Sequence, residues 1–580
     1  MRAAPSTTAV QASIHAHESS VPAEQRKADG VHYTPAVLAK FLVEQAIATL
    51  DYVPQQICDP TCGAGSFLLA AADALADRGV AVQEIVEQRL FGGEIDPQAG
   101  ALAQDSLRAW AEQRIGRVAG SRLCPQIAVG DMLLRTPESW VGRSPKGWDL
   151  VIGNPPFLSQ LATRTSRSSA VRQAVQQRFG EIGVYADSAS LFLLGALDMV
   201  CEGGVVVMVQ PQSFLATRDT AAVRSSLLGS AHLRGIWASQ AEFFEASVRV
   251  CAPVLQRSVT GDSRVVQSTQ SAQAAQSAQP AQPAQPAQAA QSVQVWWGGK
   301  PNDLGNTEQF VEQQPLPGDS WGPLLARAHG LPSVNSTAGP RLGEVATATA
   351  GFRDEFYALL DSSVDLGQSG PQLLSRAQAS PLITVGMIDP GSHSWGLQAR
   401  RFGGRKQLAP AADMAALERL QPRIAEWARA RQVPKVLVAT QTRIVEAVAD
   451  PEGRLIPVTP TISVEPRNTN RPQESVWHLT AALLAPPVSA RALATHLGAG
   501  LSSGALRWSA RSVLQVELPI DETRWASGAG LAQKLASCDQ TDRPKNLAEL
   551  GKVMCSAYEI DSTDAVFGWW LELALRAAKP

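Results

Sequence analysis

Residues 154–157, with the sequence Asn-Pro-Pro-Phe, follow an apolar run that reads as a buried strand. Asn154 offers a side-chain carbonyl oxygen, and Pro155 offers a main-chain carbonyl without a competing N–H. Pro156 fixes the direction of the chain, and Phe157 supplies a ring face on which a planar base can stack. Two rigidly held acceptors beside a ring suit the exocyclic amino group of a nucleobase, so we expect these four residues to be catalytic. The alternative is a strand that simply ends at prolines.

A second candidate site begins where an earlier strand-like run ends. Gly63 and Gly65 let the backbone turn sharply and approach a ligand, and the helix that follows offers free N–H groups. Asp59 and Pro60 stand directly before this turn. Glu94 ends the next strand-like run, where an acid is placed to accept both hydrogen bonds of a ribose diol. The alternative is an ordinary tight turn.

The spacing of this turn narrows the ligand class. The turn lacks the third glycine of a dinucleotide site and the Lys-Ser or Lys-Thr pair of a P-loop. A nucleoside without a polyphosphate fits better, and S-adenosylmethionine (S-adenosyl-L-methionine) meets that description. Asp59 would face its ammonium group and Glu94 its ribose. Asp131, after Gly130, would accept from its adenine amino group; taken alone, it fits a helix cap or turn better, but its position after successive strands favours the ligand role.

Short apolar runs alternate with helical segments from about residue 31 to residue 260, which predicts a doubly wound, Rossmann-like α/β domain. Such folds pair their strands in parallel through right-handed crossovers, and their ligands lie beyond the carboxyl ends of the strands. The patterns predict helices at residues 36–50, 65–76, 97–114 and 188–200, and strands at residues 56–59, 90–94, 125–129, 148–152, 204–209, 248–255 and 293–297.

Composition divides the chain into segments. Residues 1–30 are polar, which predicts a disordered leader before the α/β domain of residues 31–300. Residues 267–294 form an uncharged Ala-Gln-Pro tract, which we interpret as the expanded turn of a hairpin at the sheet edge. Residues 325–520 predict a second domain that is mixed or β-rich, and residues 521–580 predict a helical segment that packs against it.

The overall composition excludes some classes of protein. The 580 residues are 45% hydrophobic and 18% charged with a formal net charge of −2, so a nucleic-acid surface would have to be local. The seven cysteines form no Cys-x-x-Cys pair, which favours a reduced compartment and no metal site. No apolar run is long enough to cross a bilayer, so we expect a cytoplasmic protein without a membrane partner.

Taken together, the motifs resemble those of the class I S-adenosylmethionine-dependent DNA adenine-N(6) methyltransferases, in which the cofactor motifs precede the target recognition domain. The resemblance covers about residues 30–520. It rests on the order of five motifs: His32-Tyr33-Thr34-Pro35, the glycine loop of residues 59–67, Glu94-Ile95-Asp96, Gly130-Asp131-Met132 and Asn154-Pro155-Pro156-Phe157.

The resemblance implies the roles of further residues. It identifies residues 31–300 as the methyltransferase domain and residues 325–520 as the DNA target recognition domain. Tyr33, Thr34, Ile95 and Met132 join the cofactor site. Phe244 would sandwich a base flipped out of double-stranded DNA, with Phe243 as its rival; both could instead be core residues.

Two basic segments are candidate DNA contacts. Residues 158–179 form a basic, hydroxyl-rich stretch without acids, in which Arg164 and Arg167 would contact phosphates; a solvated loop is the alternative. Residues 400–443 predict a local DNA footprint or, in part, a solvated helix face. The basic residues of this second segment are Arg400, Arg401, Arg405, Lys406, Arg419, Arg423, Arg429, Arg431, Lys435 and Arg443.

Other functions remain open on the sequence. Cytosine N(4), a guanine of ribosomal RNA or a glutamine side chain presents a similar amino group, and the chain could be a recognition or modification subunit that needs partners. The leader is short for a nuclease domain and we see no acidic nuclease cluster. We therefore expect a stand-alone modification enzyme of a restriction-modification or defence system, acting beside a separate restriction endonuclease or defence-system proteins.

Overall fold

The computed structural model describes most of the chain. The described residues are 34–135, 139–140, 142–157, 169–180, 182, 186–241, 248–259, 291–299, 304, 307–334, 338–367, 379–467, 469–498, 506–561 and 565–577. Several predicted features lie outside them: Tyr33, Arg164, Arg167, Phe244 with Phe243, the leader, and the Ala-Gln-Pro tract up to residue 290. The chain divides into two compact units, Met1–Leu324 and Leu325–Pro580, which are described separately.

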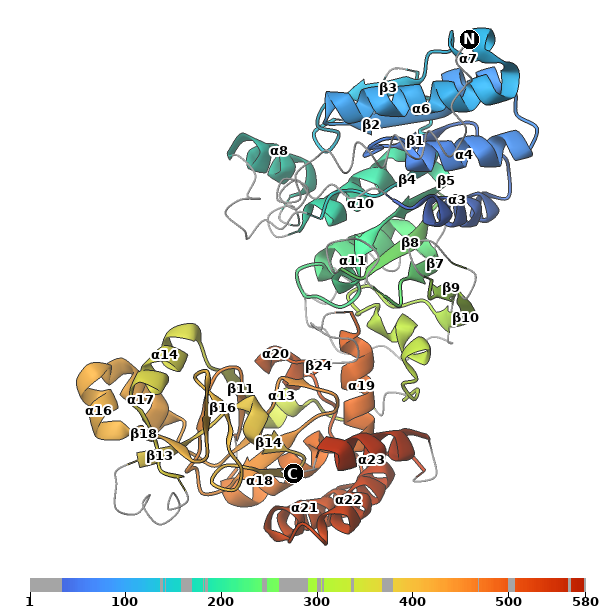
Figure 1. Cartoon of the computed structure of the whole chain (residues 1–580). Coiled ribbons are helices and arrows are strands. Elements are labelled where there is room, and N and C mark those ends of the chain that lie inside the picture. The colour runs from blue at the N-terminus through green and yellow to red at the C-terminus, as the bar shows by residue number, and fades with distance from the viewer. Residues whose placement is uncertain are drawn as a thin grey trace, which may run out of the picture. The chain divides into compact units, whose positions relative to one another are not determined.

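Among its described residues, unit 1 is built on a ten-stranded sheet (Figure 1). The strand order is β10-β9-β7-β8-β5-β4-β1-β2-β3, and β6 pairs with β8. The strands are β1 (Ile57–Asp59), β2 (Leu90–Glu94), β3 (Gln126–Val129), β4 (Trp148–Gly153), β5 (Val200–Met208), β6 (Gln210–Pro211), β7 (Ala231–Ala238), β8 (Val250–Arg257), β9 (Ser292–Trp297) and β10 (Glu308–Gln313).

The order of the sheet reverses between β1 and β4. Strand β1 pairs in parallel with both β2 and β4, β2 pairs in parallel with β3, and β4 pairs in parallel with β5. The chain therefore winds outward from β1 in one direction and outward from β4 in the other, which is the doubly wound pattern expected from the sequence. Ligands of such sheets bind in the crevice at this reversal. The predicted α/β fold class is confirmed.

The helices of unit 1 form two groups. Helices α3 (Ala36–Leu50), α4 (Ser66–Asp77) and α6 (Pro97–Ile115) form one group, and α10 (Ser188–Met199) and α11 (Ala221–Ser230) form the other. Crossovers of one handedness that run in opposite directions place the two groups on opposite faces of the sheet. The remaining helices are α5 (Val82–Glu84), α7 (Arg117–Gly120), α8 (Ser169–Phe179) and the short turns Ile85–Arg89, Gln212–Leu215 and Gly322–Leu325.

The strand pairing at one sheet edge differs from the prediction. We expected β8 and β9 to form a hairpin, but β7 lies between them, antiparallel to β8 and parallel to β9. The antiparallel partner of β9 is instead β10. A Cβ atom on Gly235 of β7 would lie 2.3 Å from the Trp296 ring of β9, so this glycine lets the ring close over the neighbouring strand. The hairpin interpretation was wrong because pairing follows this packing rather than the order of the chain.

Unit 2 contains two four-stranded sheets among its described residues. The first has the order β11-β23-β19-β21 and the second β12-β18-β13-β22. Their strands are β11 (Ala346–Ala350), β12 (Ser363–Asp365), β13 (Ala379–Ile383), β18 (Pro410–Asp413), β19 (Lys435–Val438), β21 (Ala447–Asp450), β22 (Ile456–Pro457) and β23 (Ile462–Pro466). Two-stranded ribbons pair β14 (Ile388–Asp389) with β15 (Ser392–His393), β16 (Arg400–Phe402) with β17 (Arg405–Gln407), and β20 (Gln441–Thr442) with β24 (Leu506–Arg507).

Among its described residues, unit 2 has two large hydrophobic cores and a smaller cluster. One large core joins the first sheet to the helices near the chain end, and the other lies under the second sheet and the helices of residues 353–361, 414–420 and 422–430. Three helices occupy most of the described residues after 520. The helices are α13 (Leu342–Val345), α14 (Arg353–Asp361), α16 (Met414–Leu420), α17 (Pro422–Ala430), α18 (Pro472–Leu483), α19 (Pro486–His496), α20 (Ala510–Val513), α21 (Glu522–Ser537), α22 (Arg543–Ala557) and α23 (Ala565–Ala577), with short turns at Arg327–His329 and Val385–Met387. None of the helices in the described part of the chain is long and apolar enough to span a membrane.

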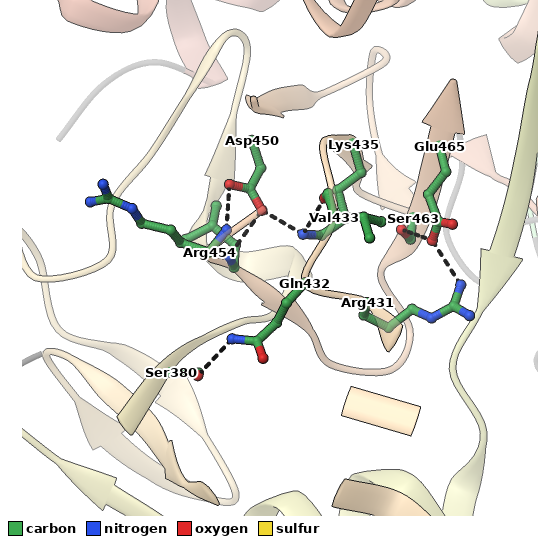
Figure 2. Close-up of polar contacts among 10 residues, drawn as sticks. Ser380, Arg431, Gln432, Val433, Lys435, Asp450, Arg454, Ser463 and Glu465 are labelled. Atoms are coloured by element: carbon green, nitrogen blue, oxygen red, sulfur yellow. Dashed lines mark hydrogen bonds and ion pairs between the residues drawn. The ribbon is translucent and has the colours of Figure 1, made fainter. Parts of the chain in front are cut away.

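A buried ion pair joins two strands of the first sheet in unit 2 (Figure 2). The Lys435 ammonium, fully buried, donates to Asp450 Oδ2 over 2.5 Å. The same aspartate accepts from the backbone N–H groups of Arg454 and Leu455, each at 2.9 Å. Burial lowers the pKa of Lys435, and the facing carboxylate opposes that shift. Asp450 therefore satisfies three donors in a region closed to water.

Replacing Asp450 by alanine should destabilise the protein by about 3–5 kcal/mol, because it leaves a buried ammonium without its counter-ion. Denaturant unfolding measures this free energy. Glu452→Ala is the matched control, since Glu452 lies in the same turn and forms only an exposed pair with Arg454. The control should leave the unfolding midpoint unchanged, and equal midpoints for the two variants would contradict the role given to Asp450.

Candidate functional site

The carboxyl ends of four parallel strands bring the predicted residues to one edge of the unit 1 sheet. Strand β1 ends at Asp59, β2 at Glu94 and β4 at Gly153, directly before the Asn-Pro-Pro-Phe segment, while β3 ends just before Gly130. Parallel strands end on the same side of a sheet, so residues up to a hundred positions apart in the chain become neighbours. This edge is the candidate site.

The glycine turn is held in a conformation that other residues rarely adopt. Gly63 and Gly65 have φ angles of 51° and 94°. Gly65 immediately precedes α4, and a Cβ atom there would only touch Ala103 at 3.5 Å, so backbone conformation rather than space requires the glycine. The Cys62 N–H donates to the Gly93 carbonyl at 2.9 Å and fixes the turn against β2. Pro60, before the turn, is buried.

Glu94 organises the corner between the glycine turn and α6. Its Oε2 accepts from the Gly63 N–H at 2.8 Å, and its Oε1 accepts from the N–H groups of Ile95 and Asp96 at 2.8 and 3.0 Å. The half-buried carboxylate thus ties the end of β2 to the turn after β1. The Ile95 side chain beside it is 67% exposed, as an apolar residue available to stack on a ligand would be.

Asp59 is a buried acid at the centre of this edge. Only 1% of its surface is exposed. Its pKa is raised to about 8, mainly by burial and in smaller part by the nearby Glu94 charge, while hydrogen bonds from Thr61 oppose the shift. The Thr61 N–H donates to Asp59 Oδ1 at 2.9 Å. A cationic group placed against Asp59 would favour its ionised form.

The Asn-Pro-Pro-Phe corner adjoins Asp59 through Gly153. Strands β1 and β4 run in register, with Cys58 opposite Val151. A Cβ atom on Gly153 would lie 2.6 Å from Asp59 Oδ1 and 3.0 Å from Thr61 Oγ1, so the backbone of β4 runs directly against the acid. The catalytic corner predicted from the sequence and the glycine turn therefore share one edge.

The four residues of the corner differ in exposure. Asn154, Pro156 and Phe157 are half-buried, and Pro155 is buried. Phe157 packs against the main hydrophobic core of unit 1, which fixes its position. The Val209 N–H donates to the Gly153 carbonyl at 3.0 Å and holds the end of β4 to the end of β5.

The turn after β3 is tight and well anchored. Asp131 Oδ1 accepts from the Leu133 N–H at 3.0 Å, and the Gly130 N–H donates to the Glu94 carbonyl at 2.8 Å. Met132 is 5% exposed and packs on Gly93, where a Cβ atom would lie 2.5 Å from Met132 Cγ. Asp131 is thus held close to the end of β2, where the predicted cofactor residues gather.

Arg178 has a structural role that the sequence did not reveal. Arg178 lies in the basic stretch of residues 158–179, which the sequence offers as a candidate DNA contact. Its Nη1 instead donates to the carbonyls of Leu133 and Arg135 at 2.7 and 2.9 Å. It therefore ties α8 to the turn that carries Asp131. The sequence gave no signal for this role, because the acceptors of Arg178 are backbone carbonyls.

The remaining predicted residues contribute less to this geometry. Thr34 is 7% exposed and stands one residue before Pro35, which caps α3. Tyr33, Arg164, Arg167 and Phe244 lie outside the described residues.

The site is built for positioning rather than for covalent catalysis. Burial raises the pKa of Cys58 and Cys62, so neither thiol supplies a thiolate near neutral pH. Within the described residues no group of three or more His, Cys, Asp or Glu side chains could hold a metal ion. Glycines, acids and rigid carbonyls at a sheet edge are what a nucleoside site requires.

A doubly wound sheet with an acid, a glycine turn and an acid at successive strand ends is the arrangement typical of nucleoside-binding α/β domains. Residues 19–304 match the model of the family described as N-6 DNA Methylase. This segment of the chain is therefore similar to the N-6 DNA methylase family, which agrees with the resemblance drawn from its motifs.

Curated relatives match parts of the chain. A type II methyltransferase, M.CvrRI of Paramecium bursaria Chlorella virus XZ-6E, is 27% identical over 137 residues, which cover 24% of this chain and 27% of that protein. The methylase subunit of the type I restriction enzyme EcoEI of Escherichia coli is 23% identical over 189 residues, covering 32% and 33%. The chain thus spans about a third or less of the length of these relatives.

A solved structure with similarity along most of the chain is a nuclease-deletion mutant of the Type ISP restriction-modification enzyme LlaGI in complex with a DNA substrate mimic. The TM-score is 0.48 at 11% identity, and the match covers 87% of this chain and 54% of that one.

Replacing Gly153 by alanine should destabilise the protein by about 1–3 kcal/mol, because the added methyl group would collide with the Asp59 carboxylate. Chemical denaturation measures the change. Gly229→Ala in α11 is the matched control, since nothing lies within 4 Å of its Cβ position, and it should be neutral or stabilising. Loss of stability in the control and none at position 153 would contradict the packing described here.

Proposed function

We propose that the protein transfers a methyl group from S-adenosylmethionine to the exocyclic amino group of adenine in duplex DNA. The observation that carries the proposal is the contact of Gly153 with Asp59, which sets the Asn-Pro-Pro-Phe corner beside the glycine turn. The match of residues 19–304 to the N-6 DNA methylase family supports the reaction class.

The residues at the sheet edge fit the parts of the cofactor. Asp59, buried and uncharged in the free protein, would ionise against the ammonium group, and Pro60, Gly63 and Gly65 would let the backbone approach. Glu94 would accept from the ribose hydroxyls with the oxygen lone pairs that its three backbone donors leave. We assign the adenine ring to the residues around its expected position: Ile95, Asp131, Met132, Tyr33 and Thr34.

The corner residues would activate the amino nitrogen of the target base. That nitrogen is a poor nucleophile because its lone pair is delocalised into the ring. The Asn154 side-chain carbonyl and the Pro155 main-chain carbonyl would each accept a hydrogen bond from one N–H group of this nitrogen. Both hydrogen bonds favour a pyramidal nitrogen with a localised lone pair. Phe157 would stack on the base and hold it in line. The cofactor supplies an electrophilic methyl group on sulfur, and preorganisation of these protein groups supplies the catalysis.

The base must leave the helix to reach this corner, because its amino nitrogen is otherwise engaged in pairing. We assign Phe244 to the second face of the flipped base and Arg164 and Arg167 to the flanking phosphates. Residues 325–520 of unit 2 would recognise the target sequence. We propose that the modification serves a restriction-modification or defence system, together with a separate restriction endonuclease or other defence proteins.

The proposal is tested by methylation-sensitive long-read sequencing of DNA from cells that express the chain. We expect N6-methyladenine at every copy of one short sequence and none in cells with an empty vector. Methylation of cytosine would assign the other amino target, and DNA without any new methylation in the presence of folded protein would refute the function.

Asn154→Ala should abolish methyl transfer, because the base loses one of its two acceptors, while cofactor affinity stays within a few-fold of the original. Radiolabelled methyl transfer to duplex DNA and calorimetry measure the two quantities. Unchanged turnover would reject the proposed mechanism, and a matching loss of cofactor binding would move Asn154 to the cofactor site.

Cofactor affinity should rise with pH between about 6 and 7.5. At pH values below its pKa of about 8, Asp59 is mostly neutral in the free protein. Binding an ammonium group requires the ionised carboxylate. Raising the pH towards the pKa therefore lowers the free energy needed to ionise Asp59. The gain is at most about tenfold per pH unit. Calorimetric titration at several pH values measures it, and Asp59→Asn should bind more weakly with a flat profile. An equally steep profile in this variant would assign the pH dependence to another group.

A further inference from the structure

The cations of residues 400–443 differ in the structure in whether an acid faces them, and Arg419, Arg423 and Arg443 are exposed without an acidic partner among the described residues. Other cations of this segment are already matched by acids. Lys435 is buried against Asp450, and Arg431 donates to Glu465 Oε1 at 2.7 Å (Figure 2). On the helices, Arg429 pairs with Glu418. These three cations have their charge compensated within the protein, so they are poor candidates for a DNA footprint.

The cations of the ribbon β16–β17 are different. This ribbon pairs residues Arg400–Phe402 with Arg405–Gln407 around a turn of two glycines with positive φ angles. The register sets Arg401 directly opposite Lys406. Both side chains are exposed. Like charges in this arrangement destabilise a strand pair.

Little in the protein compensates these charges. Among the described residues, none of Arg401, Arg405 and Lys406 has an acidic partner within salt-bridge distance. Arg400 differs, since its Nε donates to Ser394 and its charge acts on Asp389. The ribbon therefore presents three uncompensated cations on two strands, which a polyanion would stabilise.

The base of the ribbon is firmly anchored. Phe402 is 2% exposed and belongs to the second hydrophobic core of unit 2. A Cβ atom on Gly403 would lie 2.1 Å from Leu360 Cδ1, so the turn packs closely on α14. In the turn before β16, the Trp395 indole N–H donates to the Pro410 carbonyl at 2.7 Å. The cations are thus held on a rigid support and not on a loose loop.

We infer that the β16–β17 ribbon enters the major groove of the DNA and determines part of the recognition sequence through Arg401, Arg405 and Lys406. The major groove admits a two-stranded ribbon, and arginine paired with guanine is the commonest specific base contact. This inference rests on the proposed function, because the ligand is the duplex that the enzyme would methylate. The paired cations at 429, 431 and 435 are excluded from the contact.

The test compares two double variants of the full chain with the unchanged protein. Arg401→Ala with Lys406→Ala removes the opposed cations of the ribbon. Arg429→Ala with Arg454→Ala removes the same number of charges from exposed pairs with Glu418 and Glu452. Long-read sequencing of DNA from expressing cells gives the methylated sequence for each protein. Binding of the purified proteins to a duplex with the wild-type site, at several salt concentrations, gives affinity and salt slope.

The ribbon variant should lose discrimination at one or more positions of the methylated sequence and bind the duplex at least about tenfold more weakly. The slope of log affinity against log salt should fall by about one or two, while the control keeps sequence, affinity and slope. An unchanged sequence and affinity in the ribbon variant would overturn the inference and leave the proposed function intact.

Two further observations keep the outcomes distinct. Arg401→Lys with Lys406→Arg preserves the charge of the ribbon and should retain the salt slope of DNA binding. Loss of the slope in this variant too would mean that substitution damages the ribbon itself, and it would overturn the inference. If the unchanged protein methylates no DNA, the proposed function itself fails.

Discussion

The close approach of Gly153 to the Asp59 carboxylate is the constraint on which the candidate site depends. It is possible only because position 153 has no side chain, and it occurs where the strand order reverses between β1 and β4. The contact excludes water from the acid, which raises its pKa, and it carries the Asn-Pro-Pro-Phe corner to the glycine turn. One packing event therefore sets both the charge state of the predicted cofactor acid and its distance from the predicted catalytic residues.

Hydrogen bonds to backbone groups fix the geometry around this contact. Glu94 collects three N–H groups, Asp131 collects one, and Arg178 supplies donors to two carbonyls of the turn that contains Asp131. Backbone dipoles fixed in this way need little reorganisation when a ligand arrives, which is the property that catalysis by preorganisation requires. The site thus needs neither a thiolate nor a metal ion for the chemistry proposed.

The basic residues of unit 2 differ in whether an acid faces them. Lys435 is matched by Asp450 on the adjacent strand β21, and Arg431, at the end of α17, is matched by Glu465 of β23, whereas Arg401 and Lys406 lie opposite each other on an anchored ribbon. Burial makes an unmatched charge costly, so matched cations can lie inside and unmatched ones stay on the surface. The distinction separates cations that hold the unit together from cations that can meet a polyanion.

The sequence by itself determined the α/β class and the placement of the candidate residues at the strand ends, because hydrophobic periodicity is local and parallel strands must end on one edge. Gly63, Gly65, Glu94 and Asn154 could be assigned to this edge in this way, and their roles stay predictions. Only the tertiary structure decided that β7 separates β8 from β9, since that pairing depends on Trp296 closing over Gly235, 61 positions away in the chain. It alone decided which basic residues are neutralised, because pairs such as Arg431 with Glu465 form between segments whose contact no local pattern encodes.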